Sequence, residues 1–262
     1  MVWLKSEYVF ASMFSYRVPN YSPSFALTSP VPGPSTIKLA IISTAIERKG
    51  ISYGEKLFNI IRDSKVLIEP PDKIALSKAL IKRLKQDVIA KKMPKEKKEM
   101  GICAICNEHK EVWKIDNILI CKDCSSNRIS STFGIREYAH FSGPLNIFIE
   151  IENEKNLIID ILRRIKYFGT SDSLVFCKSI SEQVPDENLC VKSLEPMGME
   201  GNILLGDLAL LLADFKKDIS FKDINPYEKV RNRDPYLLSS YVFPIKLERE
   251  GKNWVIYTKI KT

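Results

Sequence analysis

The order of apolar and polar residues predicts that the chain opens with a strand, a loop and a helix. Residues 2–18 are rich in aromatic and β-branched types and predict a strand. The segment 19–35 is rich in proline, which removes backbone donors, and predicts a loop. Apolar residues at helical spacing follow, from the favoured N-cap types Ser35 or Thr36 to Gly50, which is typical of a helix end.

The remaining pattern alternates between helices and strands to the end of the chain. It predicts helices at 55–62, 72–92, 154–168 and 203–215, and strands at 65–68, 135–141, 145–152 and 173–180. A β-hairpin is predicted over residues 236–260, with Gly251 at its turn.

Residues 2–180 show a recognisable element order once the stretch near 70–130 is set aside. The order is strand, helix, strand, strand, helix, strand, which is the βαββαβ order of the ferredoxin-like fold. We therefore predict an α+β protein with four parts: the two halves of a ferredoxin-like domain at 1–70 and 131–185, an inserted basic helix and four-cysteine zinc knuckle at 71–130, and a β-rich C-terminal region with an apolar helix and a hairpin at 186–262. Such a fold hosts many functions, and RNA binding on the open sheet face is a common one.

The composition is that of a soluble globular protein. Of 262 residues, 45% are hydrophobic and 27% are charged, and the net charge of +8 is compatible with a nucleic acid or an anionic surface as partner. The longest apolar run, 203–215, is too short to span a membrane and contains two aspartates. No signal peptide is readable, so the six cysteines indicate reduced thiols and a cytoplasmic protein.

Four cysteines have the spacing of a zinc site. Cys103-Ala-Ile-Cys106 is followed, after fourteen residues, by Cys121-Lys-Asp-Cys124. The residues between the two pairs predict a short hairpin, as in zinc ribbons. Four thiolates complete a tetrahedral shell and leave no position for a reactive water, so we expect a structural Zn²⁺ and no need for His109 as a ligand. The other two cysteines lack a partner at ligand spacing and are interpreted as core or loop thiols: Cys177 and Cys190.

A run of basic residues precedes the cysteines. From Lys78 to Lys98 there are nine basic residues against two acidic ones, so this segment carries most of the net charge. It is either a solvated helix face or a patch that follows RNA phosphates beside the knuckle. The candidate RNA contacts in the run are Lys91, Lys92, Lys95, Lys97 and Lys98.

Three alternating residues form a second candidate RNA contact. Arg136, Tyr138 and His140 should share one face of a strand and, on an open sheet, could contact RNA. A histidine beside a tyrosine and a lysine could also support metal-independent RNA cleavage with the 2′-OH as nucleophile. A structural histidine or a simple RNA contact is the favoured interpretation.

A polar turn after the helix at 154–168 is a third candidate. Gly169, Thr170 and Ser171 could offer backbone donors to a phosphate. A helix C-cap explains Gly169 equally well.

Residues 25–47 resemble the N-terminal signature of the CRISPR-associated RAMP proteins of the fifth Cas family. In that signature an early strand and a proline-rich loop lead into a helix that starts Pro-Ser-Thr-x-Lys. The four matching residues are Pro34, Ser35, Thr36 and Lys38, while Leu39 stands where the family often has a small residue. The element order and the Gly169 turn also fit, and the archaeal type I-A branch is the most similar.

The resemblance implies a non-catalytic, RNA-binding subunit of a Cascade effector complex in antiviral defence. Such a subunit caps the 5′ handle of the CRISPR RNA, packs against the backbone and large subunits, and meets target DNA indirectly. The insertion would then be an enlarged thumb stabilised by zinc, and Lys38 a further candidate RNA contact.

Two alternatives stay open. One is a metal-independent endoribonuclease that processes precursor CRISPR RNA. The other, without the resemblance, is a zinc-ribbon protein of transcription or translation that binds nucleic acid.

Overall fold

The protein divides into two compact units. The computed structural model describes residues 1–19, 25–86, 98–115, 117–126, 129–194, 206–227 and 234–260. The first unit comprises Met1–Ala79 and Arg136–Thr262, and the second comprises Leu80–Ile135. In the described part of the chain, no helix is long and apolar enough to cross a membrane.

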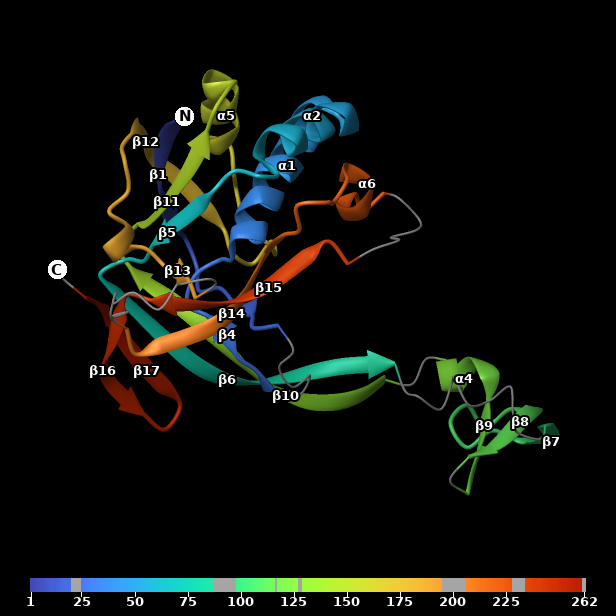
Figure 1. Ribbon diagram of the computed structural model, residues 1–262. Coiled ribbons are helices and arrows are strands. Elements are labelled where there is room, and N and C mark those ends of the chain that lie inside the picture. Colours follow the sequence, from blue (N-terminus) through green and yellow to red (C-terminus); the bar gives the residue numbers. More distant parts are fainter. Residues whose placement is uncertain are drawn as a thin grey trace. The chain divides into compact units, whose positions relative to one another are not determined.

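The first unit contains a four-stranded antiparallel sheet in the order β12-β1-β11-β5 (Figure 1). Its strands are β1 (Val2–Phe10), β5 (Val66–Glu69), β11 (Leu145–Ile151) and β12 (Val175–Glu182). The helices α1 (Pro34–Lys49) and α2 (Ile51–Ile61) connect β1 to β5, and α5 (Lys155–Leu162) connects β11 to β12. The predicted order of strands and helices is therefore present.

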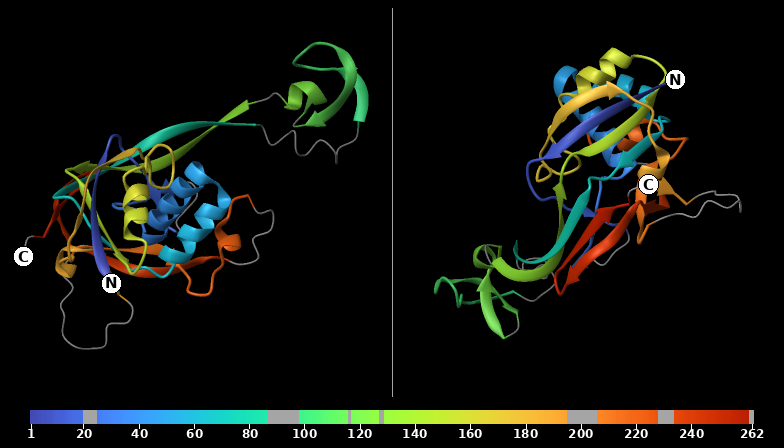
Figure 2. Two further views of the ribbon diagram at one scale, coloured as in Figure 1. Left: turned by 90° about the horizontal axis from the view of Figure 1, so that it is seen from above. Right: turned by 90° about the vertical axis from the view of Figure 1, so that its left-hand side faces the viewer.

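The helices pack on one face of this sheet, as Figure 2 shows. Leu4, Ser6 and Tyr8 alternate along β1 and are fully buried on that face. The Tyr8 hydroxyl donates a hydrogen bond to the carbonyl of Leu162 in α5, at 2.8 Å. This bond and the alternating burial show why the sheet and the helices form one core.

The opposite sheet face is partly covered by the chain itself. Leu67, Phe148 and Cys190 form a separate buried cluster there, with Trp3 packed against it. The backbone N–H of Val191 donates to the carbonyl of Ile68 at 2.8 Å, and the short helix η2 (Glu187–Leu189) lies in the same segment. The expected open face is therefore occupied at this cluster.

Helix α1 begins slightly earlier in the sequence than the pattern predicts. Gly33, not Ser35 or Thr36, is the N-cap, and Pro34 is in the first turn. Proline suits this position because it has no N–H to satisfy and its φ is already helical. The helix ends at Gly50 as predicted, where φ is +85°.

Three further sheets complete the first unit. Their orders are β16-β17-β6-β10-β3, β13-β15-β14 and β2-β4. The strands are β2 (Tyr16–Arg17), β3 (Phe25–Ala26), β4 (Thr28–Ser29), β6 (Lys73–Gln86), β10 (Ile129–Ser142), β13 (Lys192–Ser193), β14 (Leu208–Phe215), β15 (Tyr236–Phe243), β16 (Ile245–Gly251) and β17 (Trp254–Lys259). β6 and β10 extend into the second unit, and β16 and β17 form the predicted hairpin, with Gly251 opposite Trp254.

Two predicted helices are strands. Residues 73–86 of the expected basic helix form β6, which pairs with β17. Residues 208–215 of the expected apolar helix form β14, which pairs with β15 along its full length. Short apolar runs fit either period, and the available sheet partners decided both cases. Residues 87–92 and 203–205, which were predicted to belong to these two helices, lie outside the described residues.

The second unit is built around a small three-stranded antiparallel sheet. Its strands are β7 (Lys98–Ile102), β8 (His109–Ile115) and β9 (Ile118–Cys121), and the short helix α4 (Lys122–Ser126) follows. β8 and β9 are the hairpin predicted between the two cysteine pairs. The small core of this sheet contains Cys103, Val112 and Cys121, all nearly or fully buried.

Candidate metal centre and nucleic-acid interface

The four cysteines of the second unit come together as the spacing predicts. Cys103 and Cys106 lie in the turn between β7 and β8, Cys121 ends β9, and Cys124 lies in α4. Their four sulfur atoms all lie within 4.8 Å of one another. Among the described residues, His109 is not part of this donor cluster.

The separation of the sulfurs suits a tetrahedral zinc ion. The Sγ atoms of Cys106 and Cys121 are 3.9 Å apart. In a tetrahedron with Zn–S bonds of about 2.3 Å, neighbouring sulfurs are about 3.8 Å apart. The donor set therefore fits Zn²⁺, and four sulfur ligands leave no coordination position for a substrate.

The backbone holds the first cysteine ready for a metal. Asn107, directly after the first pair, has a φ of +58°, which asparagine tolerates better than most residues and which turns the chain back. Burial raises the pKa of the Cys103 thiol, but backbone hydrogen bonds from Cys106, Cys121 and Ile105 outweigh burial and lower it to about 6. These hydrogen bonds favour the thiolate of Cys103, which is the form that binds metal.

The other two cysteines lie in the first unit, away from this cluster in the sequence and without ligand partners among the described residues. Cys190 is buried against Leu67 and Phe148, and burial raises its pKa to about 12. Cys177 is half-buried in β12. Both positions agree with the interpretation as core or strand thiols.

Most of the candidate lysines lie outside the described residues. These are Lys91, Lys92, Lys95 and Lys97. Lys98 is exposed at the start of β7, where its Nζ lies 3.2 Å from the Glu111 carboxylate and 5.6 Å from the ring centre of Trp113. Lys98 is thus engaged within its own unit, although more than half of its side chain is accessible.

Arg136, Tyr138 and His140 share one face of β10 as predicted. Glu137 and Ala139, between them, are buried on the other face, while His140 is exposed and the other two are half-buried. β10 belongs to the five-stranded sheet and not to the β12-β1-β11-β5 sheet on which these residues were expected. A two-residue period fixes which residues share a face, but tertiary pairing decides which sheet the strand joins.

The Arg136 side chain has an unsatisfied donor. Its Nε atom is buried and has no hydrogen-bond partner in the described part of the chain. A buried guanidinium N–H without a partner is costly, and a phosphate or carbonyl oxygen would satisfy it.

The turn at Gly169, Thr170 and Ser171 is exposed at the surface of the first unit. Gly169 has a φ of +74°, and a Cβ built there would lie 3.4 Å from the Thr36 side chain and 3.5 Å from the Tyr16 ring. The structure therefore places this turn beside the start of α1. A left-handed φ and these close neighbours explain the glycine without a ligand.

Lys38 lies inside the protein. Its Nζ atom is 2.8 Å from Oδ1 of Asp214 and donates a hydrogen bond of 2.9 Å to the carbonyl of Arg62. Only 3% of its side chain is exposed. This placement argues against the expected phosphate contact, because the ammonium group is already paired and sealed from solvent.

A curated archaeal protein is similar to this chain along almost its whole length. CRISPR-associated protein Cas5 of Archaeoglobus fulgidus is 30% identical over 261 residues, which covers 97% of each chain. The chain belongs to the Cas5 family. No family model matches the sequence.

Two solved structures are also similar to this Cas5-family chain, at lower identity. A crystal structure of a CRISPR protein from Archaeoglobus fulgidus is 12% identical with a TM-score of 0.41, and it is matched over 100% of this chain and 93% of that one. A chain of a CRISPR RNA-guided surveillance complex is 10% identical with a TM-score of 0.40, over 92% and 87% of the two chains.

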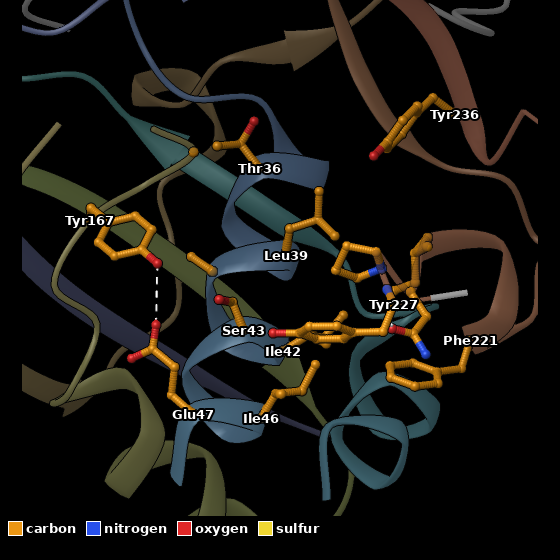
Figure 3. Close-up of a pocket in the computed structure, with 15 residues that line it drawn as sticks. Thr36, Leu39, Ile42, Ser43, Ile46, Glu47, Tyr167, Phe221, Tyr227 and Tyr236 are labelled. Atoms are coloured by element: carbon orange, nitrogen blue, oxygen red, sulfur yellow. Dashed lines mark hydrogen bonds between the residues drawn. The ribbon is translucent and has the colours of Figure 1, made fainter. Parts of the chain in front are cut away.

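This Cas5-family chain also has a pocket that the sequence analysis missed. A cavity of about 450 Å³ lies beside α1, and the short helix α6 (Phe221–Ile224) and the residues after it form its other wall (Figure 3). Leu39, Ile42 and Ile46 line it from α1, and Tyr227 lies across it. The only sequence signal was an apolar pattern that wraps most of α1, which is also what a helix packed on both sides shows.

Proposed function

We propose that this chain is the Cas5 subunit of a type I-A-like CRISPR RNA-guided surveillance complex, in which it binds the 5′ handle of the CRISPR RNA in antiviral defence. The observation that carries the proposal is the 30% identity to an archaeal Cas5 over 97% of both chains. The resemblance at Pro34, Ser35 and Thr36 supports it independently of that comparison. The expected partners are CRISPR RNA, the backbone and large subunits and, indirectly, target DNA.

The proposed scaffold is a ferredoxin-like domain with the second unit as its insertion. The strand order β12-β1-β11-β5 and the connecting helices support this fold. The insertion leaves the domain between β5 and β11, which is where the thumb of the resembling family stands.

The proposed RNA contacts are Arg136, Tyr138 and His140, the turn at Gly169–Ser171, and the lysines at 91, 92, 95, 97 and 98. The unsatisfied Nε of Arg136 and the exposure of His140 support the β10 set. Lys38 is not included, because its ammonium group is held by Asp214.

The proposed cofactor is one structural Zn²⁺ held by Cys103, Cys106, Cys121 and Cys124. The ion would tie the β7–β8 turn to the end of β9 and to α4, in a unit whose core is otherwise small. All four positions are sulfur, so the zinc supplies folding energy and no catalytic water.

Recovery of bound RNA tests the function directly. The tagged full chain is purified from its native cells and the associated RNA is sequenced. We expect short CRISPR RNAs with a common 5′ end, together with other subunits of the complex. Recovery of ribosomal or messenger RNA, or of DNA alone, would support a zinc-ribbon protein of transcription or translation instead.

A cleavage assay separates a binding subunit from a repeat-RNA endonuclease. The chain has only two histidines, and His109 belongs to the second unit, so His140 is the one candidate on the β10 face. We expect purified protein to leave repeat RNA intact in EDTA. Cleavage that persists in EDTA and disappears in His140→Ala would establish the metal-independent endoribonuclease.

A further inference from the structure

The pocket beside α1 has aromatic walls and an apolar floor. Its volume of about 450 Å³ lies in the range of small-ligand sites. Phe221, Tyr227 and Tyr236 contribute three aromatic side chains from one side. Tyr227 is 69% exposed, so its ring is not committed to the core of the first unit.

A local hydrogen bond fixes the backbone at Tyr227. The Tyr227 N–H donates to Oδ1 of Asn225 at 3.1 Å, and Asn225 is buried at the end of α6. A capping box between Ser220 and Asp223 fixes the start of α6. Figure 3 shows the ring of Tyr227 lying across α1 near Ile42 and Ser43.

A second, smaller cavity is lined from α1 by Thr44, Glu47 and Arg48. It has a volume of about 250 Å³ and shares Glu47 with the aromatic pocket. Its other lining residues are Arg164 and Lys166. Asp160 pairs with both arginines, and Nζ of Lys166 lies 3.8 Å from the Glu47 carboxylate. The three cationic side chains and the two carboxylates together carry a net charge of +1.

We propose that the two cavities, which share Glu47 as a wall, form a binding site for one unstacked nucleotide of a single-stranded RNA. The base lies against the aromatic wall formed by Tyr227 and Tyr236, and the phosphate lies over Arg48, Arg164 and Lys166. This inference rests on the proposed function, and it adds a base-holding position on the helical side of the first unit.

The chemistry of the site favours a nucleotide over an apolar side chain of a partner protein. Bases stack on aromatic rings, and single-stranded RNA is commonly held by such rings beside cationic side chains. The Ser43 hydroxyl and the Glu47 carboxylate at the pocket wall add partners for base edges, and Glu47 is fixed by a 3.2 Å hydrogen bond from the Tyr167 hydroxyl. An apolar side chain would use neither these polar groups nor the cations.

The test combines a variant of Tyr227 with removal of single bases. The full chain is titrated with a 5′-handle RNA and with a series in which one base at a time is replaced by an abasic unit. With the wild-type protein, the abasic replacement at one position should lower the RNA affinity on the order of ten-fold. In Tyr227→Leu the intact RNA should lose the same factor, and the abasic change at that position should cost nothing further.

The matched control is Tyr53→Leu. Tyr53 lies in α2, is half-buried, and lines neither cavity. Tyr53→Leu should show the same loss of affinity at each abasic position as the wild-type protein. For the phosphate end, Lys166→Gln should lower the salt slope of binding, whereas Lys155→Gln, on a lysine that pairs with Glu182, should not.

The outcomes separate the inference from the proposed function. Absence of RNA binding by wild type would overturn the proposed function. RNA binding in which every abasic position costs the same in wild type and in Tyr227→Leu would overturn the nucleotide site alone. Unchanged RNA affinity together with loss of co-purifying subunits in Tyr227→Leu would also overturn it, and would assign the pocket to a protein contact.

Discussion

Lys38 is a buried charge that is held by specific partners. Its Nζ lies 2.8 Å from Asp214 and 2.9 Å from the carbonyl of Arg62, so it links α1 to β14 and to the end of α2. The two partners differ in exposure, at 3% of the side chain for Lys38 and 30% for Asp214. Removing Asp214 therefore leaves a buried unpaired ammonium group, whereas removing the Lys38 charge leaves a partly solvated carboxylate.

We expect Asp214→Ala to destabilise the protein more than Lys38→Met. Loss of the carboxylate leaves an ammonium group buried without its counter-charge, which costs about 3 kcal/mol. Lys38→Met keeps the apolar stem and leaves only a partly solvated Asp214, so its cost should be smaller. Urea unfolding of both variants gives the comparison, and an equal loss or the reverse order would contradict the buried ion pair.

Glu137 gives a pH dependence with a defined sign. Burial raises its pKa above 4.5, although the Thr28 N–H and Lys78 act in the opposite direction. The carboxyl therefore favours the folded state when protonated, and this stability is lost as pH rises from 4.5 through the folded-state pKa. Glu137→Gln cannot ionise and keeps an oxygen that can accept the Thr28 hydrogen bond.

We expect Glu137→Gln to be more stable than wild type at pH 7, with the difference vanishing below about pH 4. Urea midpoints measured across this range test it. Glu187→Gln is the control with the opposite sign, because a hydrogen bond from Lys65 lowers the pKa of Glu187 and its ionised form favours folding. A Glu137→Gln variant that is destabilised to the same extent at pH 7 and below about pH 4 would contradict the prediction.

At the scale of elements, the second unit combines a cluster of four cysteines with few buried apolar residues. One buried cluster consists of Cys103, Val112 and Cys121, with Leu119 and the other two cysteines packed against it, and Trp113 and Ile120 are the other buried large apolar residues described in this unit. A core of this size buries too little apolar surface to hold three short strands by itself. We infer that metal binding and folding of this sheet are coupled.

We expect wild type to contain one zinc per chain and Cys103→Ser to lose it. Loss of a thiolate ligand should unfold β7, β8 and β9 while the four-stranded sheet of the first unit stays folded. Metal analysis and amide hydrogen exchange measure the two effects. Cys177→Ser makes the same chemical change outside the cluster and should retain zinc, and wild type with far less than one zinc per chain would refute the site.

The elements also show how tertiary pairing overrides local pattern. β6 and β14 carry apolar residues at spacings that fit a helix, yet both are strands because β17 and β15 offer ladders of backbone partners. By contrast, α1 and α5 are both present as helices, because their apolar faces meet a sheet. Gly50 ends α1 as predicted, but α5 ends at Leu162 with Arg163 as its C-cap, so the predicted helix over 154–168 was too long and Gly169 does not cap it.

At the scale of the whole molecule, the net charge of +8 bears on RNA affinity. Much of it lies in the stretch from Lys78 to Lys98, the centre of which is outside the described residues. A charge-driven contact has a recognisable signature, since each phosphate neutralised adds to the salt dependence of binding.

We expect replacement of Lys91, Lys92, Lys95, Lys97 and Lys98 by glutamine to weaken CRISPR RNA binding and to reduce its salt slope. For single-stranded RNA the slope should fall by roughly 0.7 for each phosphate that the protein no longer neutralises. Titrations at several salt concentrations measure it. A variant at five other lysines, Lys56, Lys65, Lys73, Lys155 and Lys178, controls for net charge. An unchanged slope in the first variant would remove the lysine run from the interface.

The sequence by itself determined the chemistry that depends on short spacings. Two C-x-x-C pairs predicted the sulfur cluster, Gly50 marked the end of α1, and alternation placed Arg136, Tyr138 and His140 on one strand face. These features are local, because a turn or a strand period of a few residues fixes them wherever the segment lies. The family resemblance at residues 25–47 also agrees with the Cas5 relationship.

Only the tertiary structure decided which segments meet. In the structure, β10 belongs to the five-stranded sheet, and the segment at Cys190 covers part of the sheet face that was expected to be open. Lys38 pairs with Asp214, and the aromatic pocket lies beside α1. The partners in these contacts are distant in sequence, as the separation of 176 positions from Lys38 to Asp214 shows. Hydrophobic and polar patterns carry no information about such pairing, because the same exposed face or buried charge can be satisfied by many different segments.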